Sequence, residues 1–216
     1  PTQKAKKLVL GYHASKSSGS TITDLCQEAG ERGAKVIQIF AKNPQRVAKT
    51  HLPEEEVQSV RRCSAAHDVA IFSHSSFLIN IAAANFKTSY GSMLLTNEID
   101  EITRLGGLGV VVHMGKTTRM SQDPAQFAER SAEAVRNMVS SLTYVLGKVP
   151  RDSAKILLEN TAGQKNETGW TFEEMARVRN ALPEADRSRV GYCLDTCHLV
   201  AAGVDSIGTL EHAKAL

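Results

Sequence analysis

Apolar residues occur along the chain in six short, nearly continuous runs rather than in alternation with polar residues. Such runs are typical of parallel strands that are covered by helices. The runs are Leu8–Tyr12, Ala34–Phe40, Val69–Phe72, Gly109–Val112, Ala154–Leu158 and Arg189–Leu194. We therefore expect six parallel strands that are joined by long connections.

The connections show the spacing of apolar residues that predicts amphipathic helices. Ser20 or Thr23 supplies a start signal for the first helix, and Thr171 with Glu174 predicts a capping box at the last. The expected helices are Thr21–Glu31, Pro53–Ala66, Phe86–Arg104, Pro124–Val145 and Thr171–Ala181. Strands and helices thus alternate, which indicates an α/β protein.

Six strand–helix units leave two candidate folds, an open doubly wound sheet and a (β/α)8 TIM barrel. The segment Gly11–Ser15 follows the first run and lacks the glycine pattern that binds a dinucleotide. The sequence therefore favours the barrel, as a single domain over residues 1–216. Such barrels typically have about 250 residues, so we expect about six of the eight β/α units, without the C-terminal part.

Composition narrows the class of protein only a little. Hydrophobic residues make up 42% and charged residues 23%, and the net charge is +3, all ordinary for a globular chain. No apolar stretch approaches the roughly 20 residues of a membrane helix, so no membrane association is expected. Four cysteines without a signal peptide do not suggest a disulfide framework. We expect an intracellular protein in a reducing compartment.

Ionisable residues stand where consecutive apolar runs end. They are His74, His113, Glu159 and Asp195, with His198 three residues further on and His13 at the end of the first run. The carboxyl ends of parallel strands meet at one face, where active sites are built. Imidazoles and carboxylates gathered there would suit Zn²⁺ or another divalent transition metal. The alternative for each histidine is a packed, hydrogen-bonded rim residue, and for Glu159 a salt bridge.

Five segments resemble the endonuclease IV family of apurinic/apyrimidinic endonucleases. They are Gly11–Ser15, Gln38–Pro44, His74–Asn80, Leu158–Gln164 and Cys193–Gly203. The resemblance runs in order from about Leu8 to Asp205. It implies a (β/α)8 barrel that carries three zinc ions and hydrolyses the DNA phosphodiester 5′ to an abasic site, leaving a 3′-hydroxyl and a 5′-deoxyribose phosphate.

The resemblance also implies a ligand set. His74, His113 and Glu159 would bind the first zinc. Glu159 would bridge to the second zinc, which Asp195 also binds, and would therefore be the catalytic residue. His198 would bind the third zinc. A hydroxide held between two zinc ions is a strong nucleophile near neutral pH.

Contacts to double-stranded DNA are implied as well. Phe77 and Leu78 would insert into the minor groove at the abasic site. Asn43, Gln45 and Arg46 would contact the DNA backbone. Without the resemblance, these side chains could instead cap the barrel core and form a solvated loop face.

His13 is expected to support the site through hydrogen bonds rather than as a ligand. The family's remaining ligands to the second and third zinc lie on the seventh and eighth β/α units, and His212 stands in a helical context. Only the first zinc's ligands are therefore complete. We expect a monomer whose functional polypeptide continues beyond Leu216 or is completed by another chain. The alternatives are a sugar isomerase or epimerase of the same barrel superfamily and a non-catalytic DNA-binding relative.

Overall fold

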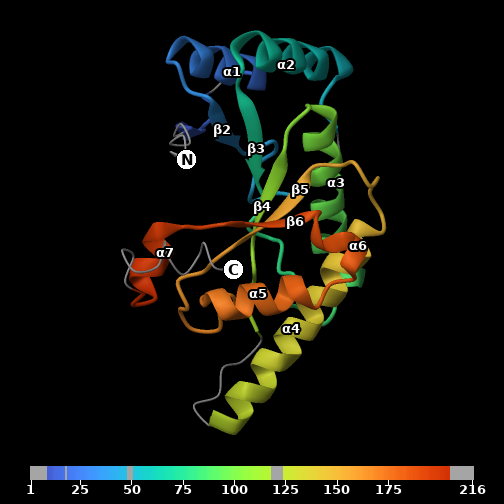
Figure 1. Cartoon of the computed structure of the whole chain (residues 1–216). Coiled ribbons are helices and arrows are strands. Elements are labelled where there is room, and N and C mark those ends of the chain that lie inside the picture. The colour runs from blue at the N-terminus through green and yellow to red at the C-terminus, as the bar shows by residue number, and fades with distance from the viewer. Residues whose placement is uncertain (1–8, 18, 48–50, 118–123, 205–216) are drawn as a thin grey trace, which may run out of the picture.

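The computed structural model describes residues 9–17, 19–47, 51–117 and 124–204 (Figure 1). Its strands form one parallel sheet, in which each strand pairs with the next along the chain. The strands are β1 (Gly11–Ala14), β2 (Val36–Ile39), β3 (Ala70–His74), β4 (Gly109–His113), β5 (Lys155–Glu159) and β6 (Val190–Cys193). This order never reverses, whereas a doubly wound sheet reverses at its switch point. The predicted barrel topology is confirmed.

The sheet is strongly twisted. In Figure 1, β2 and β3 run nearly vertically and β6 nearly horizontally, and helices lie along the outside of the strands. The helices are α1 (Ile22–Glu31), α2 (Glu54–His67), the 3-10 helix η1 (Phe86–Thr88), α3 (Tyr90–Arg104), α4 (Pro124–Leu146), α5 (Phe172–Asn180), α6 (Glu184–Arg187) and α7 (Thr196–Ala201). No helix among the described residues is long and apolar enough to cross a membrane.

The start signals of two helices differ in part from those expected. Thr21, rather than Ser20 or Thr23, caps α1 and forms a reciprocal capping box with Asp24. Thr171 caps α5, as predicted, by accepting a hydrogen bond from the Glu174 amide. The Glu174 carboxylate completes no capping box, because it accepts instead from the Gly169 amide at 2.6 Å.

The expected helix over Phe86–Arg104 is divided in two. Ser89 ends η1 and caps α3, and its hydroxyl accepts from the Gly91 amide. Serine competes with the helix for backbone hydrogen bonds, which explains the break. The short helices α6 and α7 were not predicted.

The first strand lies later in the sequence than expected. Leu8 falls outside the described residues, and Val9 and Leu10 are exposed. The ladder pairs Gly11 with Val36 and Ala14 with Ile39, so the register with β2 sets the strand. His13 consequently belongs to β1 itself.

Alternate strand residues pack against the helices and form the core. Ile37, Ile39, Ile71, Ile156 and Leu158 are all essentially inaccessible to solvent. Side chains of a strand alternate between its two faces, so the residues between them project to the opposite face. That face carries the ionisable residues at the strand ends.

Candidate metal centre

The strand register brings three of the predicted ligands to one place. His113 pairs with Glu159 across β4 and β5, so the two side chains project from the same face. His74 ends β3 and pairs with Val111, two residues before His113 and on the same face. His74, His113 and Glu159 are called the first ligand group.

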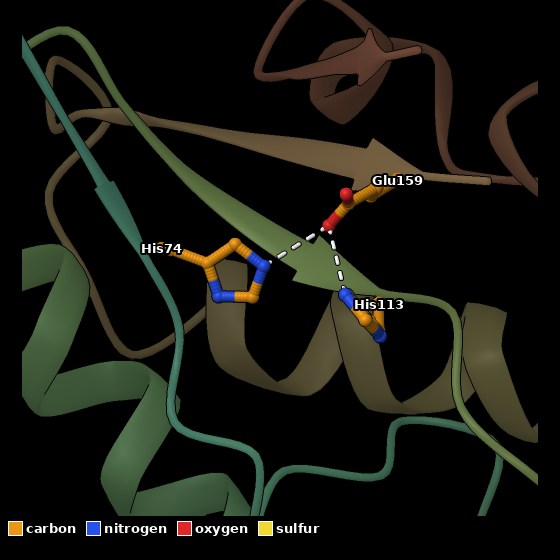
Figure 2. Close-up of side chains that lie close together, drawn as sticks. All are labelled: His74, His113 and Glu159. Carbon is orange, nitrogen blue, oxygen red and sulfur yellow. Dashed lines mark hydrogen bonds and ion pairs between the residues drawn. The ribbon is translucent and has the colours of Figure 1, made fainter. Parts of the chain in front are cut away.

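One carboxylate oxygen of the first ligand group faces both imidazoles. Glu159 Oε2 lies 3.1 Å from His74 Nε2 and 3.0 Å from His113 Nε2 (Figure 2). The other ring nitrogen of His74, Nδ1, is 2.9 Å from the Ser75 carbonyl oxygen and must donate to it. This bond fixes the ring so that Nε2 points at the carboxylate.

The electrostatics of the first ligand group favour charge separation. Burial raises the pKa of Glu159, but hydrogen bonds from His113 and His74 outweigh it and lower the pKa to about 2. Burial likewise opposes the charged form of His74, yet the Glu159 carboxylate and the Ser75 carbonyl raise its pKa above the ordinary value. The ionised Glu159 carboxylate and the charged form of His74 therefore stabilise each other.

Glu159 also belongs to a second ligand group with Asp195 and His198. Each residue offers one ligand atom, and these atoms lie within 4.8 Å of one another. Asp195 caps α7, with Oδ1 accepting from the His198 amide at 2.9 Å. His198 Nδ1 lies 2.8 Å from the Asn160 carbonyl oxygen. The structure thus places His198 beside Asp195, and its predicted assignment to a third zinc stays a prediction.

The chemistry of both groups fits a divalent transition metal. Imidazole nitrogen and carboxylate oxygen are preferred zinc ligands, and bonds of about 2.0–2.1 Å at a tetrahedral centre separate two ligands by about 3.3 Å. The two distances from Glu159 Oε2 in the first ligand group are close to that separation. Cys193 is a poorer donor: burial first, and then the charges of Glu159 and Asp195, raise its pKa to about 11.

His13 lies outside both ligand groups. Its Nδ1 is 3.0 Å from Gln38 Oε1, and its ring packs against Phe40 with centroids 4.9 Å apart. Phe40 in turn contacts the His74 ring at 5.4 Å. His13 therefore contacts the first ligand group indirectly, through Phe40.

The predicted DNA-contacting residues lie on two adjacent loops. Phe77 and Leu78 are 57% and 49% exposed, so neither is enclosed in the core. The Phe77 ring centroid is 5.8 Å from that of His74. Phe77 N and Ser76 Oγ both donate to the Pro44 carbonyl, at 3.1 and 2.6 Å. Two loops with exposed side chains thus border the candidate metal centre.

The second of these loops carries Asn43, Gln45 and Arg46, whose side chains reach the surface. Asn43 Oδ1 accepts from the Gln45 amide at 2.9 Å, an Asx turn that shapes the loop. The loop and its neighbour are held together, which places these three side chains near Phe77.

Three residues near the centre were missed. Phe40 ends the second apolar run, and Asn160 directly follows Glu159. Both lie within the motifs quoted above, so their positions could have indicated a role at the site. Nothing in the sequence distinguishes Glu98 from the other charged residues of α3. Burial raises the pKa of Glu98 to about 7, although the Ser76 amide donates to it.

Comparison with known proteins identifies the family of the fold. The family model described as a xylose isomerase-like TIM barrel matches residues 26–215. A probable endonuclease 4 of Campylobacter hominis is 30% identical over 202 residues, which are 91% of this chain and 66% of the relative. The chain spans 61–72% of the length of the curated relatives it matches first.

Two solved structures illustrate the range of the fold. Endonuclease IV from Thermus thermophilus superimposes with a TM-score of 0.70 and 28% identity, over 93% of this chain and 68% of that one. A 3-keto-D-glucoside 4-epimerase from E. coli gives a TM-score of 0.68 at 14% identity, over 95% and 75%, and shows the shared fold alone. The chain therefore belongs to the xylose isomerase-like TIM barrel family, and its resemblance to endonuclease IV is confirmed.

Proposed function

We propose that this protein is a zinc-dependent endonuclease that cleaves double-stranded DNA 5′ to abasic sites, within a single barrel domain. The observation that carries the proposal is Glu159, whose buried carboxylate faces His74 and His113 and is shared with Asp195 and His198. The endonuclease 4 relatives support a nuclease rather than another enzyme of this fold.

The residues of this chain have distinct parts in the proposed reaction. His74, His113 and Glu159 would hold one zinc ion, and Glu159 with Asp195 and His198 would contribute to the rest of a three-zinc site. When bound, the metal would activate water near neutral pH and neutralise phosphate charge. Glu159 is the catalytic residue of the proposal, because it alone belongs to both ligand groups.

A hollow of about 310 Å³ adjoins the first ligand group. Its lining includes His74, Phe77, Asn80, His113 and Thr161. This volume lies at the lower end of the range of small-ligand sites, which fits a sugar phosphate without a base. The size of the hollow is therefore compatible with a substrate in which the base is missing.

The exposed loops would engage DNA beside this hollow. Phe77 and Leu78 would wedge into the minor groove, where an inserted apolar side chain unstacks a base step. Asn43, Gln45 and Arg46 would contact the backbone, with Arg46 supplying the positive charge.

The test incubates the protein and zinc with a duplex that contains one abasic-site analogue, and with the same duplex undamaged. We expect a single incision 5′ to the lesion with a 3′-hydroxyl, and no incision of the undamaged strand. Turnover of a ketohexose with no incision would overturn the proposal in favour of an epimerase. Tight binding of the abasic duplex by zinc-loaded protein without incision would overturn it in favour of a non-catalytic relative.

A matched pair of leucines tests the wedge. Leu78→Ala removes an exposed side chain beside the centre, and Leu108→Ala removes a similarly exposed one before β4, at the opposite end of the strands. We expect Leu78→Ala to raise KM for the abasic duplex about 10-fold, because burial of a leucine side chain contributes about 1.5–3 kcal/mol. Leu108→Ala should leave KM unchanged. Equal effects of the two variants would remove the wedge from the proposal.

A further inference from the structure

Asn160 has an unusual set of contacts at the end of β5. It follows Glu159 directly and is fully buried. Its Nδ2 donates to the Asp195 carbonyl at 3.0 Å, and its Oδ1 accepts from the Asp195 amide at 2.7 Å. Its own carbonyl oxygen lies 2.8 Å from His198 Nδ1. A single residue therefore contacts both partners of Glu159 in the second ligand group.

The side-chain bonds determine where Asp195 lies. Asp195 stands after the end of β6 and before the first residue of α7, so no strand partner holds its backbone. The Asn160 carboxamide forms hydrogen bonds with both the backbone N–H and the backbone C=O of Asp195, as a neighbouring strand would. Because the backbone is fixed, the Asp195 carboxylate is held next to Glu159.

The backbone bond determines how His198 presents its ring. A carbonyl oxygen only accepts, so His198 Nδ1 must donate to Asn160 and carry the proton. In the neutral ring the lone pair then lies on Nε2, which becomes the available ligand atom. Metal-ligating histidines almost always donate their other ring nitrogen in this way.

We infer that Asn160 is a positioning residue that assembles the second ligand group before metal binds. The inference rests on the metal site of the proposed function and adds to it a residue whose side chain belongs to neither ligand group. It explains how a turn and a six-residue helix present ligands that the neighbouring strands do not place.

The chain offers a matched control in Asn80. Asn80 Nδ2 donates to the Lys116 carbonyl at 2.8 Å, and Asn80 Oδ1 accepts from the Lys116 amide at 3.0 Å. A similar clamp therefore joins the loops after β3 and β4, outside both ligand groups. Because Asn80 also lines the hollow, it serves as a control for amide exchange and zinc binding and not for DNA cleavage. Asn80→Ala reports the general cost of losing such a clamp.

The first measurement uses metal-free protein and so does not depend on the proposed activity. Nitrogen NMR should show His198 protonated on Nδ1, and the Asp195 amide should exchange slowly with solvent. In Asn160→Ala the Asp195 amide should lose its protection, whereas in Asn80→Ala it should keep it. Protection retained in Asn160→Ala, or a His198 ring protonated on Nε2 in the wild type, would overturn the inference.

The second measurement titrates Zn²⁺ into each protein against a competing chelator. Wild type and Asn80→Ala should bind in a tighter and a weaker step. Asn160→Ala should keep the tighter step and weaken the second about 10–100-fold, as for other residues that orient ligands. Equal weakening in both asparagine variants would contradict positioning by Asn160. Asn160→Ser, with a smaller polar side chain, should show the same selective loss if the alanine variant does not fold.

Failure of the proposed function would look different. Zinc binding without incision of abasic DNA would count against the endonuclease and leave the inference standing. The NMR measurement tests the positioning role of Asn160 whether or not the protein cleaves DNA.

Discussion

Glu159 joins two ligand groups that the fold builds in different ways. His74, His113 and Glu159 end three adjacent strands, and the register of β3, β4 and β5 sets their spacing. Asp195 and His198 come from the turn after β6 and the first turn of α7. Backbone ladders position the first ligand group, whereas side-chain hydrogen bonds position the second.

The two groups also differ in exposure. The side chains of Glu159 and His74 are 7% and 12% exposed, and those of Asp195 and His198 are 31% and 26%. His113, at 38%, is the open member of the first ligand group. Ligands that are already desolvated and fixed lose less freedom when a metal binds. We therefore expect the first ligand group to bind metal more tightly, while the second can be lost through a single substitution.

The largest effect is expected at the residue that the two groups share. Glu159→Gln replaces a carboxylate with a neutral amide and weakens both groups at once, so incision of abasic DNA should fall at least about 10³-fold. Affinity for the abasic duplex should change little, because Phe77 and the backbone-contacting loop remain. Single-turnover incision and fluorescence anisotropy measure the two quantities.

Glu174→Gln is the control, because it makes the same change at a buried glutamate outside the two ligand groups. Glu174 accepts from Gly169 and Ser131 and belongs to neither ligand group. It should retain incision within about threefold, since its amide oxygen can still accept. Normal incision by Glu159→Gln would contradict the shared role of Glu159 in the two ligand groups.

A smaller and more selective effect is expected when the groups are separated. His113→Ala should weaken the tighter zinc-binding step about 100-fold or more, since removal of a ligand costs at least as much as removal of a residue that orients one. His198→Ala should leave that step within about threefold and weaken the second. Isothermal titration with zinc distinguishes the steps. If both variants weaken the same step equally, the two groups act as one site.

The first ligand group was predictable because strand geometry is local and repetitive. Each apolar run that ends in an ionisable residue delivers that residue to the same end of a parallel sheet. The rule places His74, His113 and Glu159 at the same end of the sheet, whereas their grouping as ligands of one zinc came from the family resemblance. Asp195 was predicted as a strand end and is instead the N-cap of a helix, two residues past β6.

The remaining features depend on contacts between distant segments. Asn160 binds Asp195 across 35 positions of sequence, and nothing in either local pattern specifies the partner. The start of β1 is likewise set by its register with β2 and not by the apolar residues that precede it. Hydrogen bonds of this kind arise only once the strands are neighbours.

The first ligand group should contribute its own pH dependence to stability. Glu159 has a pKa of about 2, below its ordinary 4.5, so its stabilisation is present above pH 4.5 and lost as the pH falls toward 2. His74 has a raised pKa, so its stabilisation is present below 6.5 and lost as the pH rises past its folded value. Both contributions coexist between about pH 4.5 and 6.5.

Thermal unfolding of metal-free protein measures this window. Glu159→Gln should lower Tm most between pH 4.5 and 6.5, by about 2–4 °C for each kcal/mol lost. A Tm difference between Glu159→Gln and wild type that is constant from pH 3 to pH 9 would show that the carboxylate and the imidazoles are not coupled.

The smallest effect is expected from the loss of the aromatic ring of Phe40, which packs against the first ligand group. The Phe40 ring contacts His13, His74 and Phe77, with centroid distances of 4.9, 5.4 and 5.6 Å. Phe40→Leu keeps an apolar side chain but loses these ring contacts, each of which contributes about 0.5–1.5 kcal/mol.

Loss of that support should loosen the His74 ring and weaken the tighter zinc-binding step about 2–10-fold, while the second step stays unchanged. Phe86→Leu, at a fully buried position packed under α3, controls for lost core packing and should affect stability without favouring either step. If Phe40→Leu weakened both steps equally, the aromatic contacts would support the whole centre. The stronger binding of the first ligand group would then have to come from the strand register and burial alone.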